Sequence, residues 1–442
     1  MSLSFSEIKE TIMEEVRLSL TERIHPSNEE TITLEWTVSP FDTLNIINEL
    51  STSPFFYFKD KEGENEYLGL GKYRSFTSML ELDEIEKLSL KNPRWFFSFT
   101  QHFDQQNKDD TIWTDFSPFK VTLHTVTLVR NKDRYSVIVL IPNSDSEIDR
   151  KMAENEMDNL LNIVGPGKGT LNKISETLFP EQAEWNAIIN KAKDSIEEGE
   201  FEKVVLARKK ITKYNRAIHA RDLMPVIENK GVGCFHILYR PDPNALFMSL
   251  TPERLFSLKN KTIQIDAIAG TRKRGMDSAS DKMLEEEMLN SSKELHEHRL
   301  VSDQVEDFLK EWGRSIKIEK EMVLKLPFLQ HLHTRFKAEI KSGITLTSII
   351  SQLHPTAAIG GFPKSEALDF IQEHEPFVRG LYASPIGYIQ GVNVDIAVAI
   401  RSTLWKGVES HSFGGAGIVA DSIDVKEWEE TGKKLDSFEV SH

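Results

Sequence analysis

Two Glu-x-x-Glu pairs, Glu294/Glu297 and Glu427/Glu430, stand in stretches with helical patterning. The i, i+3 spacing places both carboxylates of a pair on one helical face. If the two helices face each other, four carboxylates meet, and they repel one another unless a hard cation such as Mg²⁺ lies between them. The alternative is two solvated helix faces, because the chain has 69 Asp and Glu residues and most charge runs are exposed.

Lys203 and Glu253 are candidates for acid–base chemistry. Lys203 opens the apolar strand Lys-Val-Val-Leu-Ala-Arg, where a lysine is usually a solvated edge residue. If it is buried instead, desolvation lowers its pKa and makes it a general base near neutrality. Glu253 follows a strand in the segment Leu-Thr-Pro-Glu-Arg-Leu. It is either an ordinary first-turn residue of a helix or a partly buried acid that donates a proton to a leaving group.

Several further positions are suited to binding an anion. Arg401 lies in the apolar segment Val-Ala-Ile-Arg-Ser-Thr, which we expect to be a strand, and a buried arginine must meet an acid or an anionic ligand. The loop Gly414-Gly-Ala-Gly417 offers backbone N–H groups to a carboxylate. Gly270-Thr271 allows close approach of the backbone to a ligand, or it simply turns the chain. Lys434 falls one helical turn after Glu430 and equally fits an ordinary ion pair.

The histidines and the cysteine give weaker signals. His331 and His333 share one strand face, but without a third ligand they are more typical of packed histidines than of a zinc site. Cys234 is the single cysteine of the chain, which excludes an internal disulfide and a thiolate metal cluster. Its apolar surroundings predict an inert thiol in the core.

Composition narrows the class of protein. The 442 residues have 39% hydrophobic and 28% charged side chains, which is sufficient for a sizeable core. The formal net charge of −15 disfavours nucleic acid and anionic membranes as partners. Apolar runs are strand-sized, and the first residues, MSLSFSEIKE, lack the features of a secretion signal. We therefore expect a cytoplasmic protein without a nucleic-acid or membrane partner.

The elements that must position these residues follow from periodicity. The first 145 residues are rich in strand patterns, with a predicted hairpin of 120–129 and 135–141. From about 182, helices alternate with strand pairs, including a long helix over 279–312 and a closing helix over 425–440. This order predicts an α+β fold with antiparallel sheets. We divide the chain into a strand-rich supporting region, residues 1–181, and a region carrying the chemistry, residues 182–442, within one integrated fold.

The order and wording of the segments resemble one known group. They are KVVLAR, SLTPERL, IAGTRKRG, KELHEHRLVSDQVEDFL, LHPTAAIGGFPK, RGLYASPIGY, VAIRST and GGAGIVADSIDVKEWEETGKKL. Together they resemble the chorismate-utilising enzyme family over residues 182–440, and more faintly at Leu68-Gly-Leu-Gly71. The resemblance implies a single large α+β unit in which packed antiparallel sheets are flanked by helices.

The resemblance also implies roles for the acid–base and metal positions. Lys203 would activate a water molecule that attacks C2 of chorismate, and Glu253 would protonate the departing C4 hydroxyl. Mg²⁺ would be bound directly by Glu297 and Glu430, with Glu294 and Glu427 reaching it directly or through water. The metal would hold the ring carboxylate of the substrate.

The remaining implied positions bind substrate. Gly270, Thr271 and His298 match positions that line the pocket. The clamp on the enolpyruvyl carboxylate would be formed by Tyr382, Arg401, Lys434 and the backbone around Ala416 and Gly417.

Within the family, the chain is most similar to members that convert chorismate to isochorismate. The alternative is a salicylate-forming member, which also eliminates pyruvate. Members that use ammonia typically lack a lysine at the position of Lys203, so no obligate amidotransferase partner is expected. A non-catalytic chorismate-binding subunit is disfavoured because Lys203, Glu253, Glu297 and Glu430 are all present. Menaquinone and siderophore synthesis both remain open as pathways.

Overall fold

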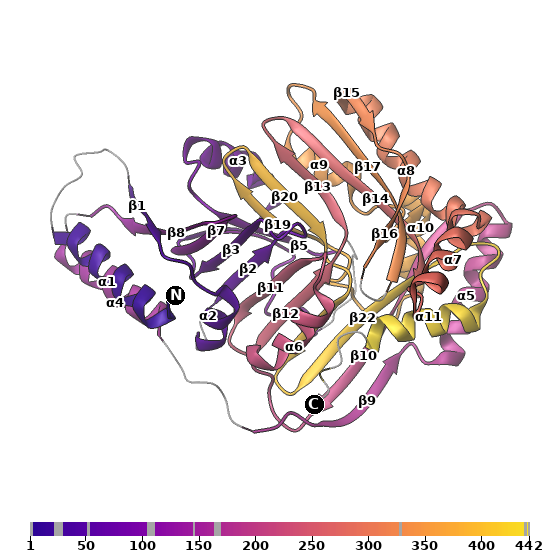
Figure 1. Cartoon of the computed structure of the whole chain (residues 1–442), viewed down its shortest axis with the longest axis horizontal. Helices are drawn as coiled ribbons and strands as arrows, with labels where there is room; N and C mark the ends of the chain where they lie inside the picture. The colour runs from indigo at the N-terminus through magenta and orange to yellow at the C-terminus, as the bar shows by residue number, and fades with distance from the viewer. Residues whose placement is uncertain are drawn as a thin grey trace.

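The computed structural model describes residues 3–21, 30–50, 54–103, 111–144, 146–162, 169–326, 329–436 and 440. Within these ranges the chain forms two antiparallel sheets, one of twelve and one of ten strands, and the helices lie around them (Figure 1). This arrangement confirms the α+β fold class that the strand and helix patterns predict.

The larger sheet contains strands from both ends of the chain. Its order is β1 (Thr31–Val38), β8 (Arg134–Pro142), β7 (Val126–Asn131), β3 (Asn65–Leu70), β2 (Phe55–Lys59), β11 (Phe235–Asp242), β12 (Ala245–Thr251), β21 (Ser402–Lys406), β22 (Glu409–Ile418), β10 (Lys203–Tyr214) and β18 (Gly361–Phe362), and β9 (Lys173–Phe179) also pairs with β10. The pairing of β2 with β11 joins the strands of residues 1–181 to those of residues 182–442.

The smaller sheet is likewise shared between the two regions. Its order is β15 (Gly313–Ile318), β17 (Leu329–Ile340), β14 (Thr262–Lys273), β13 (Arg254–Lys259), β20 (Asn393–Val398), β19 (Pro385–Gln390), β5 (Phe97–Gln101), β6 (Phe119–Leu123) and β4 (Arg74–Phe76), with β16 (Met322–Lys325) on β17. Because β5 pairs with β19, neither sheet is complete without residues 1–181.

Eleven helices occur in the described ranges. They are α1 (Phe5–Thr21), α2 (Thr43–Glu49), α3 (Leu82–Lys91), α4 (Glu147–Leu160), α5 (Gln182–Glu197), α6 (Ala220–Lys230), α7 (Ser278–Leu289), α8 (Ser292–Trp312), α9 (Leu346–Leu353), α10 (Lys364–His374) and α11 (Asp424–Asp436). Two short 3₁₀ turns cover Met79–Glu81 and Thr111–Trp113. In the part of the chain that the structure describes, no helix has the length and apolar character needed to cross a bilayer.

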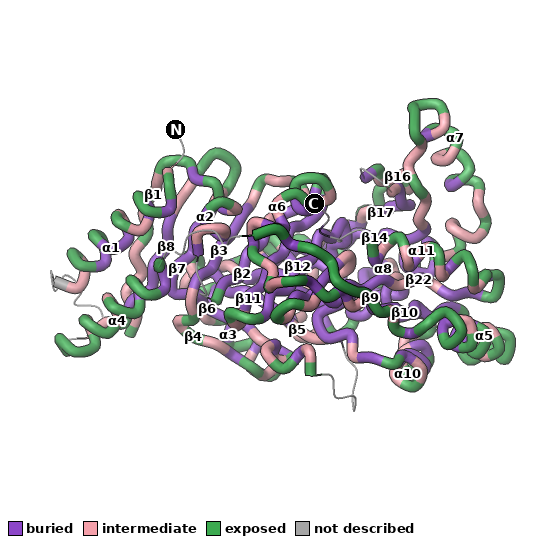
Figure 2. Tube along the Cα trace, turned by 90° about the horizontal axis from the view of Figure 1, so that it is seen from below, coloured by how far each residue is buried: buried purple, intermediate pink, exposed green. Residues whose placement is uncertain are grey.

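Two hydrophobic cores hold the layers together, and β2 shows how. Alternate residues of a strand point to opposite faces. Phe56 and Phe58 therefore enter the core between the two sheets, whereas Phe55 and Tyr57 enter a second core under α1, α2 and α6. Figure 2 shows the buried strands at the centre and the exposed helix faces outside. Burial on both faces explains why residues 55–58 of β2 are all apolar instead of alternating with polar residues.

The structure corrects three predicted elements. The helix predicted over 279–312 is two helices, because α7 ends at Leu289 and α8 begins at Ser292. The strand predicted over 120–129 divides at His124, and β6 pairs in the smaller sheet whereas β7 pairs with β8 in the larger one. Only the second half thus forms the predicted hairpin. The closing helix ends at Asp436, and residues 437–439 lie outside the described ranges.

Candidate active site

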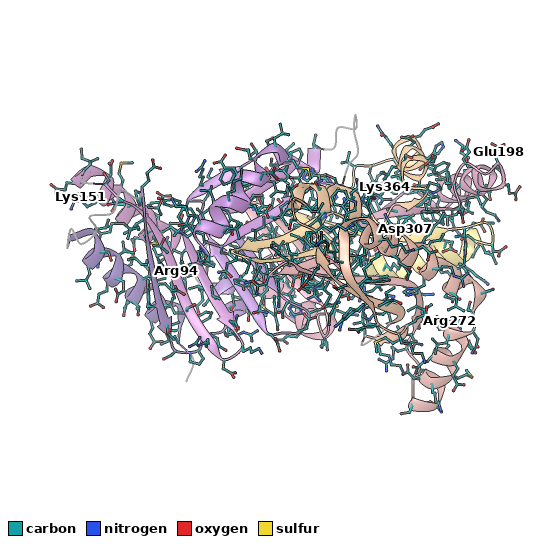
Figure 3. The ribbon with its side chains drawn as sticks, turned by 90° about the horizontal axis from the view of Figure 1, so that it is seen from above. Arg94, Lys151, Glu198, Arg272, Asp307 and Lys364 are labelled. Carbon is teal, nitrogen blue, oxygen red and sulfur yellow. The ribbon has the colours of Figure 1, made fainter. Side chains whose placement is uncertain are left out.

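A cavity lies between strand ends of both sheets and the helices α8 and α11. Most of the positions singled out in the sequence line it: Lys203, Glu253, Gly270, Thr271, Glu297, Tyr382, Arg401, Gly417, Glu430 and Lys434. In Figure 3 the helix α7 and Arg272 beside it lie at the end of the molecule opposite Lys151 on α4. The cavity therefore belongs to the end that carries α7, α8 and α11, away from α1 and α4 (Figure 1).

Lys203 is the first residue of β10 and is buried, with 2% of its surface exposed. Burial lowers the pKa of its ammonium group, and the charges of Glu297, Glu253 and Glu430 oppose this change. The opposing strand β22 leaves room for the side chain only because residue 417 is glycine. A Cβ at Gly417 would lie 2.8 Å from Cε of Lys203. Lys203 is thus a buried cavity residue and not a solvated strand edge.

Glu253 lies in the short turn between β12 and β13 and is 5% exposed. A strand, not a helix, follows it, so it does not serve a helix terminus. Burial raises the pKa of its carboxyl to about 7, against the positive charges of Lys203 and Lys61. A carboxyl with this pKa is substantially protonated near neutral pH, which is the property that a general acid requires.

A buried ion pair fixes the strand that carries Lys203. Arg379 is completely buried and pairs with Glu375. Its Nη2 donates to the carbonyl of Val205 (2.7 Å), and its Nη1 donates to the carbonyl of Ile359 (2.8 Å). The carboxylate of Glu375 accepts a hydrogen bond from the amide of Ala207 (2.7 Å). These bonds tie β10 to the 356–360 loop, whose residue Ile359 also lines the cavity.

Arg401 occupies the crossing between β20 and β21, so the prediction that it lies within a strand is wrong. Its backbone has φ +46°, where the chain passes from the smaller sheet to the larger one. Its Nη2 lies 2.9 Å from Nε2 of His331, and its guanidinium also contacts the thiol of Cys234. Among the described residues no carboxylate forms an ion pair with Arg401, so an anion in the cavity would find this cation uncompensated.

His331 is a cavity residue that the sequence did not identify as a substrate-binding position. Because a guanidinium only donates, Nε2 of His331 must accept from Arg401, and the ring proton must reside on Nδ1. Nδ1 lies 3.0 Å from Oγ1 of Thr271 and 3.3 Å from the carbonyl of Gly270. Burial, together with the charge of Arg401, holds the pKa of His331 well below its usual value. The neutral ring therefore orients Arg401.

Gly270 has a role that requires glycine. It adopts φ +71° where the pairing of β14 with β17 shifts register between Ala269 and Thr271. A Cβ at this position would lie 3.1 Å from Cβ of Glu294 on α8. The absence of a side chain lets β14 turn into the cavity and lets α8 pack closely against it.

The helix side of the cavity contains carboxylates paired with cations. Glu430 on α11 accepts a hydrogen bond from Nζ of Lys434 (2.8 Å), which also donates to the carbonyl of Gly415 (2.7 Å). Burial works against the charge of Glu430, but Lys434, together with the charges of Lys293 and Lys433, outweighs it, and the net effect is a lowered pKa. Glu427 is 3% exposed and lies 3.2 Å from Nζ of Lys293 on α8, which brings α8 and α11 together.

Glu297 lines the cavity with Glu430, whereas Glu294 and Glu427 lie outside its lining. Glu294 accepts hydrogen bonds from Arg272 (3.0 Å) and Ser291. Burial and the charge of Glu430 raise the pKa of Glu427, although Lys293 opposes them. In the described ranges, no three His, Cys, Asp or Glu side chains converge as a formed metal site. The donor set nevertheless fits Mg²⁺, because it consists of carboxylate oxygens on two neighbouring helices. On α11 the buried carboxylate of Glu427 lies near that of Glu430.

Of the predicted substrate-binding positions, His298 points away from the cavity, and the prediction for Ala416 concerns its backbone and not its side chain. His298 is 2% exposed and does not line the cavity, because its Nε2 shares hydrogen bonds with Thr334 (2.8 Å) and Ser302 (3.3 Å) between α8 and β17. Burial lowers its pKa to about 4. The side chain of Ala416 lies in the core between the sheets, on the opposite face of β22 from Gly417.

The remaining sequence candidates are structural neighbours of the site. His333 lies 3.2 Å from Asp266, while its strand neighbour His331 contacts Arg401, so the two do not share a ligand in this structure. Cys234 is buried, and burial raises the pKa of its thiol, as expected for an unreactive core cysteine.

Comparisons with known proteins agree with this architecture. Residues 19–439 match the family described as "Chorismate binding enzyme". The chain is 32% identical over 347 residues to "Salicylate biosynthesis isochorismate synthase" of Pseudomonas aeruginosa, covering 76% of this chain and 72% of the relative. It is 27% identical over 399 residues to "Isochorismate synthase MenF" of Escherichia coli, covering 89% of each protein.

Solved structures give the same result. The menaquinone-specific isochorismate synthase MenF from Escherichia coli superposes with a TM-score of 0.87 at 25% identity, covering 98% of this chain and 99% of that one. The likeness therefore extends over both sheets and all the elements that build the cavity.

Proposed function

This chain belongs to the chorismate binding enzyme family and is an isochorismate synthase, and we propose that it works by adding water at C2 of chorismate while the C4 hydroxyl departs, with Mg²⁺ as cofactor. One observation carries the proposed mechanism. Lys203 and Glu253, both buried in one cavity, have pKa values shifted in opposite directions, each toward the form that the reaction needs.

The proton transfers follow from these two groups. Neutral Lys203 accepts a proton from a water molecule as its oxygen bonds to C2 of the ring. The ring double bonds then shift by one position each, and the bond between C4 and its hydroxyl breaks. Protonated Glu253 donates its proton to the departing oxygen, which leaves as water. One water enters and one leaves, so the reaction is an isomerisation, and solvent returns the proton from Lys203 to Glu253.

Binding of the substrate falls to the cations of the cavity. Chorismate has two carboxylates, and a protein with net charge −15 attracts it only through local positive charge. Arg401, oriented by His331, is placed to bind one carboxylate with Tyr382 and the backbone around Gly417 beside it. Lys434, which lines the same cavity, contributes a further positive charge.

The metal would be held by Glu297 and Glu430, with Glu294 and Glu427 in support. When bound, Mg²⁺ would offset and orient the ring carboxylate of chorismate. The carboxylates would position the cation because they lie on the neighbouring helices α8 and α11. The contact between Lys293 and Glu427 joins the first turns of these two helices.

The buried Lys203 also supports water, and not ammonia, as the nucleophile, because ammonia needs no base of this kind. We therefore propose that the enzyme acts without an amidotransferase partner. Relatives are named for salicylate biosynthesis and for menaquinone, and isochorismate is a product that suits either use.

The product assay tests the proposal. The purified protein is incubated with chorismate and MgCl₂, and the products are separated by liquid chromatography. We expect isochorismate as the product. Salicylate together with pyruvate would instead support the salicylate-forming alternative, and the absence of isochorismate from folded protein would refute the proposed reaction.

A further inference from the structure

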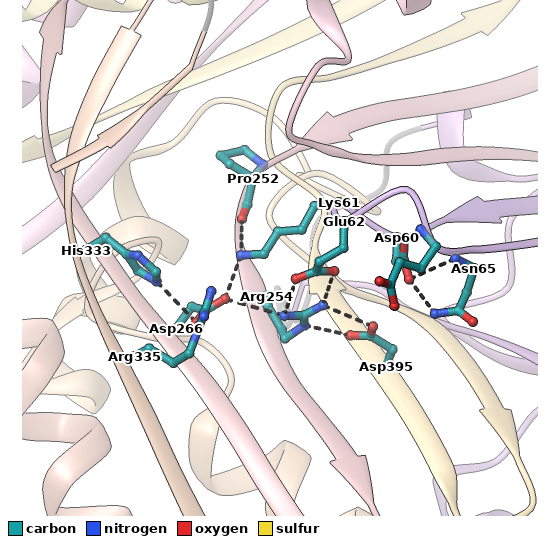
Figure 4. A network of polar contacts seen from close by, with 11 residues as sticks. Asp60, Lys61, Glu62, Asn65, Pro252, Arg254, Asp266, His333, Arg335 and Asp395 are labelled. Carbon is teal, nitrogen blue, oxygen red and sulfur yellow. Dashed lines mark hydrogen bonds and ion pairs between the residues drawn. The ribbon is translucent and has the colours of Figure 1, made fainter. Parts of the chain in front are cut away.

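Both neighbours of Glu253 in the sequence, Pro252 and Arg254, take part in a network of buried and half-buried charged side chains, Pro252 through its carbonyl group (Figure 4). The network joins three parts of the fold: the turn between β2 and β3, the turn between β12 and β13, and the strands β14, β17 and β20. Its charged members are Lys61, Glu62, Arg254, Asp266, Arg335 and Asp395. Lys61 and Glu62 come from the N-terminal region, almost two hundred residues from Glu253.

Lys61 holds the peptide group that leads into Glu253. Its Nζ donates to the carbonyl oxygen of Pro252 (3.2 Å), which belongs to the peptide bond between Pro252 and Glu253. The same Nζ lies 2.6 Å from Oδ2 of Asp266, and the Lys61 side chain is only 10% exposed. A charged lysine in this setting is restrained on two sides, so it fixes the backbone at Glu253 against β14.

Glu62 and Asp395 hold the next residue in the same way. Arg254 is 5% exposed, and its two terminal nitrogens donate to the carboxylate of Glu62 (3.1 and 2.9 Å). Its Nε donates to Asp395 (3.0 Å) on β20. The bidentate geometry restricts rotation of the guanidinium. The residues on both sides of Glu253 are thus bound by consecutive residues of the β2–β3 turn.

Of the six charged side chains named above, three are cations and three are anions, and Lys61 is one of the cations. Asp266 has a fully buried side chain and accepts from Arg335 (3.2 Å) as well as from Lys61. Loss of Lys61 would leave this carboxylate less well compensated next to Glu253. The charged and titratable groups that interact with Glu253 come from four parts of the fold. They are Lys203 on β10, Lys61 in the β2–β3 turn, Asp266 on β14, and Tyr382 before β19.

We propose that Lys61 is a positioning residue for Glu253, through which the N-terminal region completes the active site. Lys61 does not touch the cavity, since it is absent from the lining, and it acts on the reaction through the Pro252 carbonyl and Asp266. The proposal rests on the proposed role of Glu253 as the general acid. It gives residues 1–181 a part in catalysis beyond completing the two sheets.

The test compares Lys61→Gln and Lys61→Arg with wild type and with Lys72→Gln, a matched control at an exposed lysine of the same region. For each protein, kcat and KM for chorismate, the pH profile of kcat/KM and the thermal unfolding midpoint are measured. For Lys61→Gln we expect kcat to fall roughly tenfold with little change in KM, because the acid is misplaced and not the binding groups. Lys61→Arg should recover much of the activity, and Lys72→Gln should match wild type.

The pH profile separates positioning from a merely structural role. The charge of Lys61 opposes the rise in the pKa of Glu253, and that of Asp266 adds to it. In Lys61→Gln the alkaline limb of the kcat/KM profile, which reports the pKa of Glu253, should therefore move to higher pH. In Lys61→Arg this limb should lie at its wild-type position. A folded Lys61→Gln protein with wild-type kcat and an unmoved limb would overturn the proposal.

Glu62→Gln provides a second test of the proposal. The Glu62 side chain is 41% exposed, so the fold should tolerate loss of its charge more easily than loss of the Lys61 charge. This variant should lower kcat by a few fold through Arg254 without moving the Glu253 limb. Should Lys61→Gln fail to fold, wild-type kcat in Glu62→Gln would overturn the proposal. Glu253→Gln separates the role of Glu253 as the general acid from the role of Lys61 as its positioning residue. If Glu253→Gln stays active, the role of Glu253 itself is wrong. If it is inactive while both turn variants behave as wild type, only the role of Lys61 is wrong.

Discussion

The two sides of the cavity prepare their charged groups in opposite ways. On the sheet side, Lys203 and Glu253 are almost completely buried. Burial lowers the pKa of Lys203 and raises that of Glu253, so it favours the uncharged form of each group. On the helix side, Glu430 is partly exposed, and its pairing with Lys434 lowers its pKa and keeps it charged. Desolvation favours neutral forms, whereas ion pairing favours charged ones.

This difference indicates a division of labour. A group that exchanges protons must be able to change charge near the working pH, and the sheet side provides this property. A metal ligand must stay ionised, and on the helix side the pairing of Glu430 with Lys434 provides that property. The rigid strand pairing of β10 with β22 suits proton transfer, which depends on fixed geometry. Variants on the two sides should therefore fail in different ways.

The largest effect is expected from Lys203→Met on the sheet side. Removal of a general base lowers rates by about 10² to 10⁴ fold, and we expect kcat to fall by about 10³ fold. The amount of isochorismate formed at saturating Mg²⁺, measured by chromatography, checks this. Lys213→Gln, at an exposed position of the same strand, is the matched control and should keep wild-type activity. Substantial turnover by Lys203→Met would remove the lysine from its role.

Glu430→Gln on the helix side should act on the metal instead. We expect Mg²⁺ to bind roughly 10 to 100 fold more weakly, because one carboxylate ligand is replaced by a neutral amide. Calorimetric titration of the substrate-free protein with MgCl₂ measures this directly and does not depend on turnover. The neighbouring exposed Glu429→Gln serves as the control. Equal Mg²⁺ affinity in all three proteins would contradict the ligand assignment.

Gly417→Ala tests how closely the sheet side is packed around Lys203. The new Cβ would lie 2.8 Å from Cε of Lys203, so the side chain must move. We expect kcat to fall by about tenfold, with Mg²⁺ affinity changed much less. Gly432→Ala on α11 is a matched control, because nothing lies within 4 Å of its added Cβ. If both alanine variants turn over at the wild-type rate, Lys203 has more freedom than the structure implies.

The pH dependence should show the smallest effect, a change of a few fold per pH unit. The carboxyl of Glu253 has a pKa of about 7, so its proton is present below this pH and lost as the pH rises through it. The rate should therefore decline on the alkaline side of about pH 7. On the acid side it should decline because Lys203 becomes protonated. The profile of kcat/KM, which reports the free enzyme, measures both limbs. A flat profile between pH 6 and 8 would contradict the role of Glu253.

The helix side was the easier one to predict from the sequence. Glu297 and Glu430 lie on two helices that have clear periodicity, and i, i+3 spacing places each on one helical face with Glu294 or Glu427. The break between α7 and α8 escaped prediction because the apolar stripe continues across it. Asn290 and Ser291, both frequent at helix ends, were the available signal.

The sheet side depends on contacts that local patterns do not encode. The division of 119–131 into β6 and β7 leaves both halves apolar, so no change in hydropathy marks where the chain changes sheets. Arg401 looked like a strand residue because its neighbours are apolar, yet it adopts φ +46° at the crossing. His331 and Lys61 gain their roles from partners about 70 and 200 residues away, which a single sequence does not reveal.

The most direct test of the division of labour is the rate of isochorismate formation across a Mg²⁺ titration, measured side by side for wild type, Lys203→Met and Glu430→Gln. We expect Lys203→Met to stay inactive at every Mg²⁺ concentration. We expect Glu430→Gln to approach the wild-type rate as Mg²⁺ rises, because its acid and base remain intact. Restoration of Lys203→Met by Mg²⁺, or a Glu430→Gln protein that stays inactive while saturated with Mg²⁺, would contradict this division of labour.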